Sequence, residues 1–241
     1  MSSRSRNLIL VVAGRHDRQA RSLVERWSGS GANLLTCEDL SVAGWRYTLN
    51  DPENSTLVIG GQSIAADEIA GVLTRLPYVP ERELFRIARE HRRYVAAEMT
   101  AFLRSLLSTL PCPVLNRPVP TSLSGPGWCH EQWAHAAARL AIPVRPVRRR
   151  IAFAADAQEA EPVTSDVTVA VVGERCLGAT NDVIAAQARR LARAAQVDLL
   201  SVRFGGSEDE LKLIGADAWP DTSSPEVADA ILEYLTGGGR C

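Results

Sequence analysis

The 241-residue chain is almost devoid of lysine: its 27 lysines and arginines include a single lysine, Lys212. Chemistry that needs a lysine as a compact point charge is therefore restricted, because arginine does not replace it freely. Together with abundant alanine, the bias is typical of a GC-rich bacterial genome. The formal net charge of −1 argues against a dedicated nucleic-acid binder, which is usually basic.

Cysteine pairs and long apolar runs are also missing. The five cysteines are widely separated and form no C-x-x-C motif: Cys37, Cys112, Cys129, Cys176 and Cys241. This pattern indicates neither a disulfide framework nor a zinc knuckle. The first apolar run, Leu8–Ala13, is too short for a signal peptide or for the ~20 residues of a membrane span. We expect a cytoplasmic protein with no membrane partner.

The common nucleotide and nucleophile motifs do not occur. The sequence has no Walker A motif and no G-x-S-x-G elbow, and Gly14–Asp17 after the first apolar run lacks the glycines of a dinucleotide site. Cys129, His130 and His135 lack an oriented third partner, so we interpret the thiol as structural or incidental. His91 lies on an apolar helical stripe, which favours a core histidine over a ligand.

Strands and helices alternate through the first half of the chain, which predicts an α/β domain. The expected strands are Leu8–Ala13, Ala32–Cys37, Gly44–Leu49, Ser55–Gly60, Gly71–Leu76 and Pro113–Arg117. The expected helices are Asp17–Trp27, a long one after Pro80 with apolar positions from Leu84 to Leu110, and Glu131–Leu140. Proline and glycine residues at 118–127 predict a loop before the last of these helices.

The second half is patterned differently. The expected strands are Pro143–Ala155, Val167–Val172, Cys176–Ala179, Val197–Phe204 and Glu210–Ile214. Asn181 is placed to cap one helix and Pro225–Leu235 forms another, while Ala157–Ser165 is expected to be a surface turn or linker. The basic residues Arg145 and Arg148–Arg150 fit either a solvated strand face or a contact with phosphate or an acidic peptide.

Several segments, in order, resemble the ATP-grasp superfamily. They are "GVLTRL" (Gly71–Leu76), "YVAAEMTAFLRSLL" (Tyr94–Leu107), "CPVLNRP" (Cys112–Pro118), "WAHAAARLAIPV" (Trp133–Val144), "VTVAVVGERCLGA" (Val167–Ala179) and "LARAAQVDLLSVRF" (Leu191–Phe204). The resemblance covers most of the chain, although each motif alone is weak. It implies a pre-ATP-grasp-like mixed-sheet domain at residues 1–142, joined to a truncated ATP-grasp-like α+β domain at residues 143–241.

The resemblance also implies a chemistry, and the chain departs from it. ATP-grasp ligases join a carboxylate to an amine or thiol through an acyl-phosphate, with ATP and Mg²⁺ as cofactors. Their lid lysines would fall within Arg145–Asp166, where none occurs. Among the metal ligands the resemblance carries over Asp198 and, at the asparagine position, Asp217, whereas the glutamate position holds Gly215. Two carboxylates could bind Mg²⁺ weakly, but both aspartates also suit a strand start and a turn, so weakened or lost ATP and Mg²⁺ binding is expected.

Three functions follow from these departures. The favoured one is a degenerate ATP-grasp-like protein whose Arg75, Asn116 and Arg117, at strand ends, bind a carboxylate of a small molecule or peptide, or a partner ligase. The two arginines could instead pair with acidic residues of their own fold. The alternatives are an active carboxylate–amine ligase with a minimal lid, completed in a homo-oligomer by a second subunit, and an α/β binding module unrelated to nucleotides.

Overall fold

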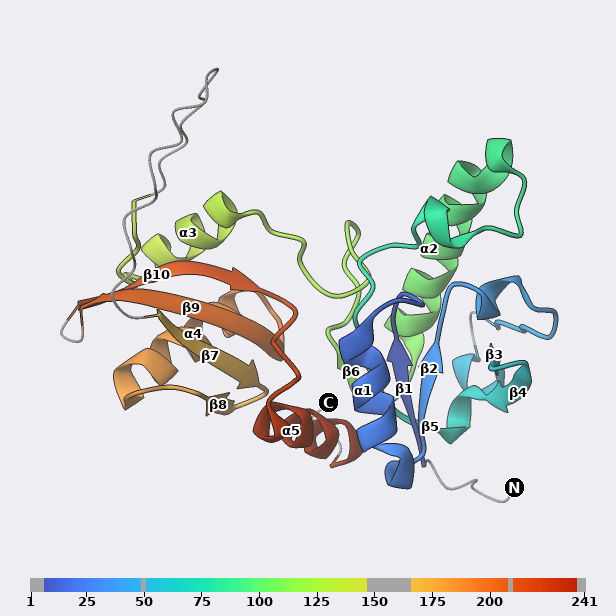
Figure 1. Cartoon of the computed structure of the whole chain (residues 1–241), viewed down its shortest axis with the longest axis horizontal. Coiled ribbons are helices and arrows are strands. Elements are labelled where there is room, and N and C mark those ends of the chain that lie inside the picture. The colour runs from blue at the N-terminus through green and yellow to red at the C-terminus, as the bar shows by residue number, and fades with distance from the viewer. Residues whose placement is uncertain (1–6, 49–50, 147–165, 208–209, 238–241) are drawn as a thin grey trace. The chain divides into compact units, whose positions relative to one another are not determined.

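The computed structural model describes residues 7–48, 51–146, 166–207 and 210–237 (Figure 1). The chain divides into two compact units. The first contains residues 1–127 and 221–241, and the second contains residues 128–220. No helix in the described ranges has the length and hydropathy needed to cross a membrane.

A parallel sheet forms the centre of the first unit, with the strand order β2-β1-β5-β6. Its strands are β1 (Leu8–Val12), β2 (Ala32–Leu35), β5 (Ile69–Thr74) and β6 (Val114–Leu115). Strand β1 is an uninterrupted apolar run, LILVV, whose last four residues are buried. Such a run is expected where helices cover both faces of a parallel sheet.

Three helices cover this sheet: α1 (Arg18–Arg26), α2 (Arg92–Thr109) and α5 (Pro225–Thr236). Helix α2 packs with Leu10, Val12 and Val72 on one face, and α1 and α5 lie on the other (Figure 1). Helix α5 approaches the sheet at Gly71, where a Cβ atom would lie 2.7 Å from Cβ of Leu235. Only glycine allows this approach of helix and strand.

A small hairpin is attached to the first unit. Strands β3 (Thr56–Ile59) and β4 (Gln62–Ala65) pair in antiparallel register around Gly60 and Gly61. Both glycines have positive φ, 58° and 80°, which is the requirement of a two-residue hairpin turn. The predicted strand Ser55–Gly60 is observed here as β3, whereas β4 was not among the strands expected from the sequence.

The second unit is built on an antiparallel sheet with the order β10-β9-β7-β8. Its strands are β7 (Asp166–Val172), β8 (Arg175–Leu177), β9 (Leu199–Ser207) and β10 (Glu210–Asp217). Helices α3 (His130–Arg139) and α4 (Asp182–Ala194) share one apolar cluster with the sheet. Asn181 caps α4 as predicted, with its side-chain oxygen 2.9 Å from the backbone nitrogen of Ile184. The predicted α/β class, with a parallel and an antiparallel sheet, is confirmed.

The units do not divide at the expected boundary between residues 142 and 143. Helix α3, assigned from the sequence to the first domain, belongs to the second unit, where Trp133 and Ala137 pack with Val202 and Phe204. Helix α5 returns to the first unit and packs on β5. The sequence pattern shows where a helix lies along the chain but not which sheet receives its apolar face.

The long helix begins later than predicted. The residues before it form two short 3₁₀ turns, Glu81–Glu83 and Arg89–His91, and α2 starts only at Arg92. Arg92 donates to the carbonyl oxygens of Ile87 (2.9 Å) and Phe85 (3.3 Å), which stabilises the non-helical path. His91 is exposed at the N-cap, so its prediction as a core histidine is wrong.

Two other segments differ from their predictions. Residues 44–48 form no strand and make only one bridge, between Arg46 and Thr56. In the segment predicted as the strand Pro143–Ala155, Val144 bridges to Leu213 of β10. The remainder of that segment from residue 147, with Arg148–Arg150 and the predicted linker Ala157–Ser165, lies outside the described residues.

Candidate functional site

Arg75 stands directly after β5 at the carboxyl edge of the parallel sheet, as expected, but its guanidinium group is held by its own fold. Its Nε lies 2.9 Å from Oδ2 of Asp17, and another nitrogen donates to Oε1 of Gln19 at 2.8 Å. Asp17 also caps α1 by accepting from the backbone N–H of Ala20 at 3.0 Å. The arginine side chain is only 10% exposed. These contacts give Arg75 a structural role.

The network around Arg75 extends to the end of the first unit. Gln19 donates to Oδ1 of Asp221 at 2.8 Å. Hydrogen bonds from the backbone and hydroxyl of Ser223, then the nearby charge of Arg75, lower the pKa of Asp221. Arg75 therefore helps to bind residues from three distant parts of the chain into one unit.

Arg117 is engaged in a similar way at the end of α2. Its guanidinium donates to the carbonyl oxygens of Leu107, Ser108, Leu110 and Cys112 at 3.0–3.4 Å. The last carbonyls of a helix lack partners within it, and a cation there is favourable. Although Arg117 is exposed, its hydrogen-bonding groups serve the fold.

Asn116 is the third predicted ligand-binding residue, and it is 3% exposed. The register of β5 with β6 places it beside Thr74 on the edge of the sheet. Gly125 approaches it so closely that a Cβ atom there would lie 3.0 Å from Cβ of Asn116. Ligand binding by these three residues stays a prediction, and the contacts of both arginines favour the alternative in which they stabilise their own fold.

The same edge of the sheet holds a thiol that the sequence did not single out. Cys37 is 1% exposed, and burial, followed by the negative charge of Glu83, raises its pKa to about 12. A carboxylate oxygen of Glu83 accepts from the backbone N–H of Arg15 at 3.2 Å. The thiol is therefore protonated at neutral pH and is a poor nucleophile.

In the second unit, the two predicted metal ligands lie at the ends of neighbouring strands. Asp217 is the last residue of β10, opposite Ser201, whereas Asp198 lies in a bend directly before β9. Binding of Mg²⁺ by this pair stays a prediction. Asp217 further accepts from the backbone N–H of Trp219 at 2.8 Å.

The position that corresponds to the metal-binding glutamate is surrounded by cationic or protonatable groups. Gly215 is buried and pairs with Arg203 of β9. A Cβ atom at Gly215 would lie 3.3 Å from Nδ1 of His130 and 3.7 Å from a guanidinium nitrogen of Arg203. The sequence pattern did not indicate that His130 approaches Gly215, because His130 begins α3, far from β10 along the chain.

These residues do not fit Mg²⁺. The ion prefers carboxylate and water oxygens in octahedral geometry, and a guanidinium group repels it. Within the described ranges, no group of three histidine, cysteine, aspartate or glutamate side chains could hold a metal ion. Cys129, His130 and His135 accordingly form no such group: Cys129 is the exposed N-cap residue of α3, and its backbone N–H donates to Gln132 at 2.8 Å.

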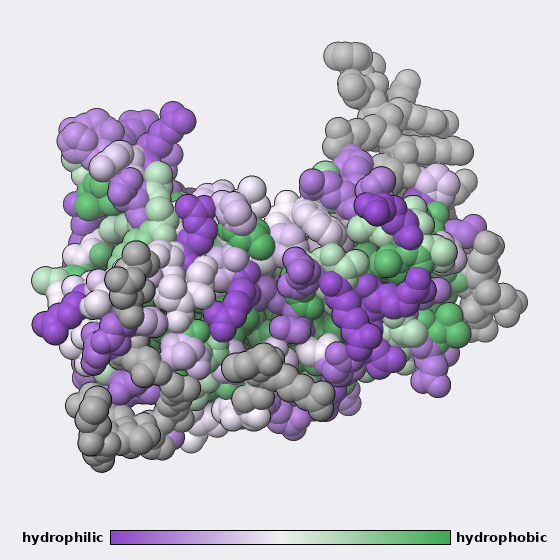
Figure 2. Space-filling view, turned by 180° about the vertical axis from the view of Figure 1, so that it is seen from behind, coloured by the Kyte–Doolittle hydropathy of each residue, from purple (hydrophilic) through white to green (hydrophobic). Residues whose placement is uncertain are grey.

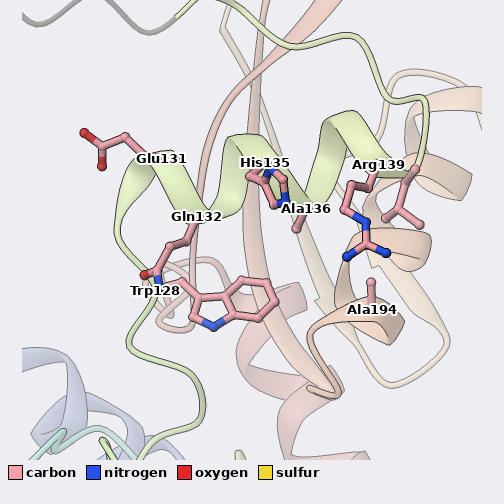
Figure 3. Close-up of a pocket in the computed structure, with 8 residues that line it drawn as sticks. Trp128, Glu131, Gln132, His135, Ala136, Arg139 and Ala194 are labelled. Carbon is pink, nitrogen blue, oxygen red and sulfur yellow. The ribbon is translucent and has the colours of Figure 1, made fainter.

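A pocket of about 670 Å³ opens along α3, entirely within the second unit (Figure 3). Its lining residues come from α3, from the residues on either side of it and from the end of α4: Trp128, Glu131, Gln132, His135, Ala136, Arg139, Leu140 and Ala194. The volume falls in the range of small-ligand sites. The sequence pattern did not predict this pocket: it grouped His135 with Cys129 and His130 as a possible catalytic site.

Large exposed hydrophobic side chains give no further site. They are Tyr78, Phe85, Tyr94, Val183 and Trp219. In the face shown in Figure 2, hydrophobic side chains lie interspersed with hydrophilic ones. Single exposed apolar residues are ordinary on protein surfaces.

The fold resembles that of solved peptide-modifying ligases. No protein-family model matches the chain, and no curated protein matches its sequence. The ATP-grasp ligase PsnB, in complex with a phosphomimetic variant of its minimal precursor, Mg and ADP, has a TM-score of 0.67 at 14% identity; the match covers 95% of this chain and 99% of PsnB. The macrocyclase MdnC from Microcystis aeruginosa MRC, bound with precursor peptide MdnA, has a TM-score of 0.63 at 12% identity, with 95% and 99% covered.

A third structure is a RiPP-associated ATP-grasp ligase from Chryseobacterium gregarium, in complex with ADP and a leader and core peptide. Its TM-score is 0.61 at 12% identity, and the match covers 96% of this chain and 97% of that one. Identities this low show the fold alone. The chain has the fold of these solved ATP-grasp ligases, which is the fold that the resemblance in the sequence implied.

Proposed function

We propose that this protein is an ATP-grasp-fold protein that binds a peptide, or another ligand with a carboxylate, and does not complete ligation. The observation that carries the proposal is the surroundings of Gly215. His130 and Arg203 lie where a carboxylate would be needed to hold Mg²⁺. The family's metal ligands are therefore not reproduced at this position.

The consequence for catalysis is electrostatic. Phosphoryl transfer from ATP relies on Mg²⁺ to neutralise the charge that develops between the β- and γ-phosphates. The guanidinium group of Arg203 opposes a divalent cation, and Gly215 supplies no carboxylate to offset it.

Two observations support a peptide or another carboxylate as the ligand: the fold and the arginine side chains of the second unit. Solved proteins with this fold have been captured with precursor peptides. In the second unit, the guanidinium groups of Arg139 and Arg203 have no hydrogen bond or ion pair with another described residue. Arginine binds carboxylates through two parallel hydrogen bonds, so peptide carboxylates are suitable ligands.

Nucleotide turnover tests this proposal. Purified protein is incubated with ATP and Mg²⁺, with and without candidate peptides, and ADP release is measured beside PsnB as a positive control. We expect release indistinguishable from a protein-free sample. ADP release that rises with protein concentration and disappears in Asp198→Asn would contradict the proposal and favour a ligase with a minimal lid. Binding of Mn²⁺ followed by electron paramagnetic resonance provides an independent measurement of the metal site.

A further inference from the structure

The pocket along α3 has a rigid apolar wall. The Trp128 ring packs against Trp133 with centroids 4.6 Å apart and an interplanar angle of 60°. Trp133 is itself 2% exposed, so core packing orients the Trp128 ring. Ala136, Leu140 and Ala194 complete the apolar lining. An aromatic or aliphatic group of a ligand would lose water contact on this wall, which favours binding.

The polar side of the pocket is cationic. Arg139 is exposed, and its guanidinium group has no hydrogen bond or ion pair with any other described residue. His135 lies one helical turn before it on the same side of α3 (Figure 3). At the same end of the pocket, Arg190 of α4 donates to the carbonyl oxygen of Leu140. A second guanidinium group therefore lies close to the pocket.

The one acidic lining residue does not oppose this charge. Glu131 begins the first turn of α3, two turns before Arg139, and its carboxylate points away from the pocket (Figure 3). Gln132 lies beside Trp128 and presents an amide. The pocket thus combines an apolar wall with an unopposed guanidinium group at one end, which is the complement of an apolar group next to a free carboxylate.

We propose that the α3 pocket binds an apolar residue together with its free carboxylate, as at the C-terminus of a peptide. The apolar side chain packs on Trp128, and the carboxylate accepts hydrogen bonds from Arg139. This inference rests on the proposed function, because it names the ligand group and its site. A free N-acylated amino acid offers the same chemistry, and the experiment separates the two sources.

The experiment measures binding to the full-length protein by fluorescence anisotropy. The probe is dansyl-Gly-Gly-Phe with a free C-terminus, and its C-terminal amide is the matched control peptide. We expect the acid to bind at least about tenfold more tightly than the amide, the effect of a hydrogen-bonded charge. Competition with N-acetylphenylalanine identifies the source: weak competition supports the peptide C-terminus, and competition equal to that of the unlabelled peptide overturns it in favour of a small acid.

Variants test the two parts of the pocket separately. Arg139→Gln should weaken binding of the acid peptide about tenfold and leave binding of the amide peptide unchanged. Trp128→Ala should weaken binding of both peptides, and Trp128→Phe should restore it. Arg26→Gln, at another exposed arginine that pairs with Asp229 in the first unit, should change neither. Circular dichroism and melting temperature establish that each variant is folded. Equal binding of acid and amide, or equal effects of Arg139→Gln and Arg26→Gln, would overturn the inference.

The outcome is distinguishable from failure of the proposed function. ADP release in the presence of peptide contradicts the proposed function whichever peptide binds. If no ADP is released and peptide binding is unchanged by Arg139→Gln and Trp128→Ala, only the pocket assignment is overturned.

Discussion

Two arginines of the first unit differ from two of the second in the contacts of their guanidinium groups. In the first unit, Arg75 and Arg117 donate to Asp17, Gln19 and the carbonyl oxygens at the end of α2. In the second unit, the guanidinium groups of Arg139 and Arg203 make no hydrogen bond or ion pair with any other described residue. A cation available for a ligand is therefore easier to find in the second unit, although the sequence directed attention to strand ends in the first.

The largest expected effect is the loss in the free energy of unfolding caused by Arg75→Ala, compared with the loss caused by Arg203→Ala. Loss of Arg75 leaves Asp17 without its partner in a site where the arginine is 10% exposed, so we expect a loss of about 2–3 kcal/mol in the free energy of unfolding. Arg203→Ala should cost less than about 0.5 kcal/mol. Urea denaturation followed by circular dichroism measures both, and equal losses would remove the distinction between the units.

The buried thiol of Cys37 in the first unit should make the stability of the protein depend on pH. Burial raises the pKa of Cys37 from 9.0 to about 12. Below pH 9 both states carry the neutral thiol and its contribution is intact. Between pH 9 and about 12 the thiol ionises only in the unfolded chain, so stability falls by up to about 1.4 kcal/mol per pH unit.

Urea denaturation at about pH 8 and about pH 10.5 measures this dependence in the wild type, in Cys37→Ala and in Cys129→Ala. We expect a smaller loss in Cys37→Ala than in the wild type, and Cys129→Ala, at an exposed thiol of the second unit, serves as the matched cysteine variant. Iodoacetamide should correspondingly label Cys129 in the folded protein and Cys37 only after unfolding. Rapid labelling of Cys37 under native conditions would show that the first unit does not bury it.

A smaller effect is expected at the end of α2. Arg117→Ala removes a cation from four carbonyl oxygens, and we expect a loss of about 1 kcal/mol because the side chain is exposed. Arg139→Ala, at the last residue of α3 without described partners, should change the melting temperature little. A larger effect at Arg139 than at Arg117 would reverse the comparison.

The smallest effect concerns Gly215→Glu. A carboxylate placed between His130 and Arg203 should stabilise the protein by about 0.5 kcal/mol relative to Gly215→Gln, the isosteric neutral control. The gain should decrease in about 1 M salt, where the Debye length is about 3 Å. The substitution should create no Mn²⁺ binding, because the new carboxylate lies beside the guanidinium group of Arg203. Lower stability of the glutamate variant than of the glutamine variant would show that the site is not cationic.

Sequence reasoning succeeded where a pattern is local. The apolar run of β1 and the Asn181 cap of α4 each depend on residues within a few positions. It failed at the start of α2, where Leu84 and Ile87 pack into the core from non-helical backbone while keeping helical spacing. The spacing of apolar residues indicates which residues are buried, but it does not show whether the backbone between them is helical.

The candidate sites were harder to predict for a related reason. The strand-end position of Arg75 could be inferred, but its partner Asp17 is 58 residues away. The pocket along α3 needs Ala194 from α4, and its charge depends on the direction in which Glu131 points. Contacts between distant residues and the direction of a side chain cannot be inferred from the spacing of residues in the sequence.

The sequence by itself determined the alternation of strands and helices, the α/β class and the departures from the ATP-grasp motifs, because periods of 2 and 3.6 residues and individual residue identities are properties of the chain. Only the tertiary structure decided that α3 joins the second unit and α5 the first, and that His130 and Arg203 meet at Gly215. Strand register and helix packing join residues far apart in the chain, and these contacts set the local charge on which the chemistry depends.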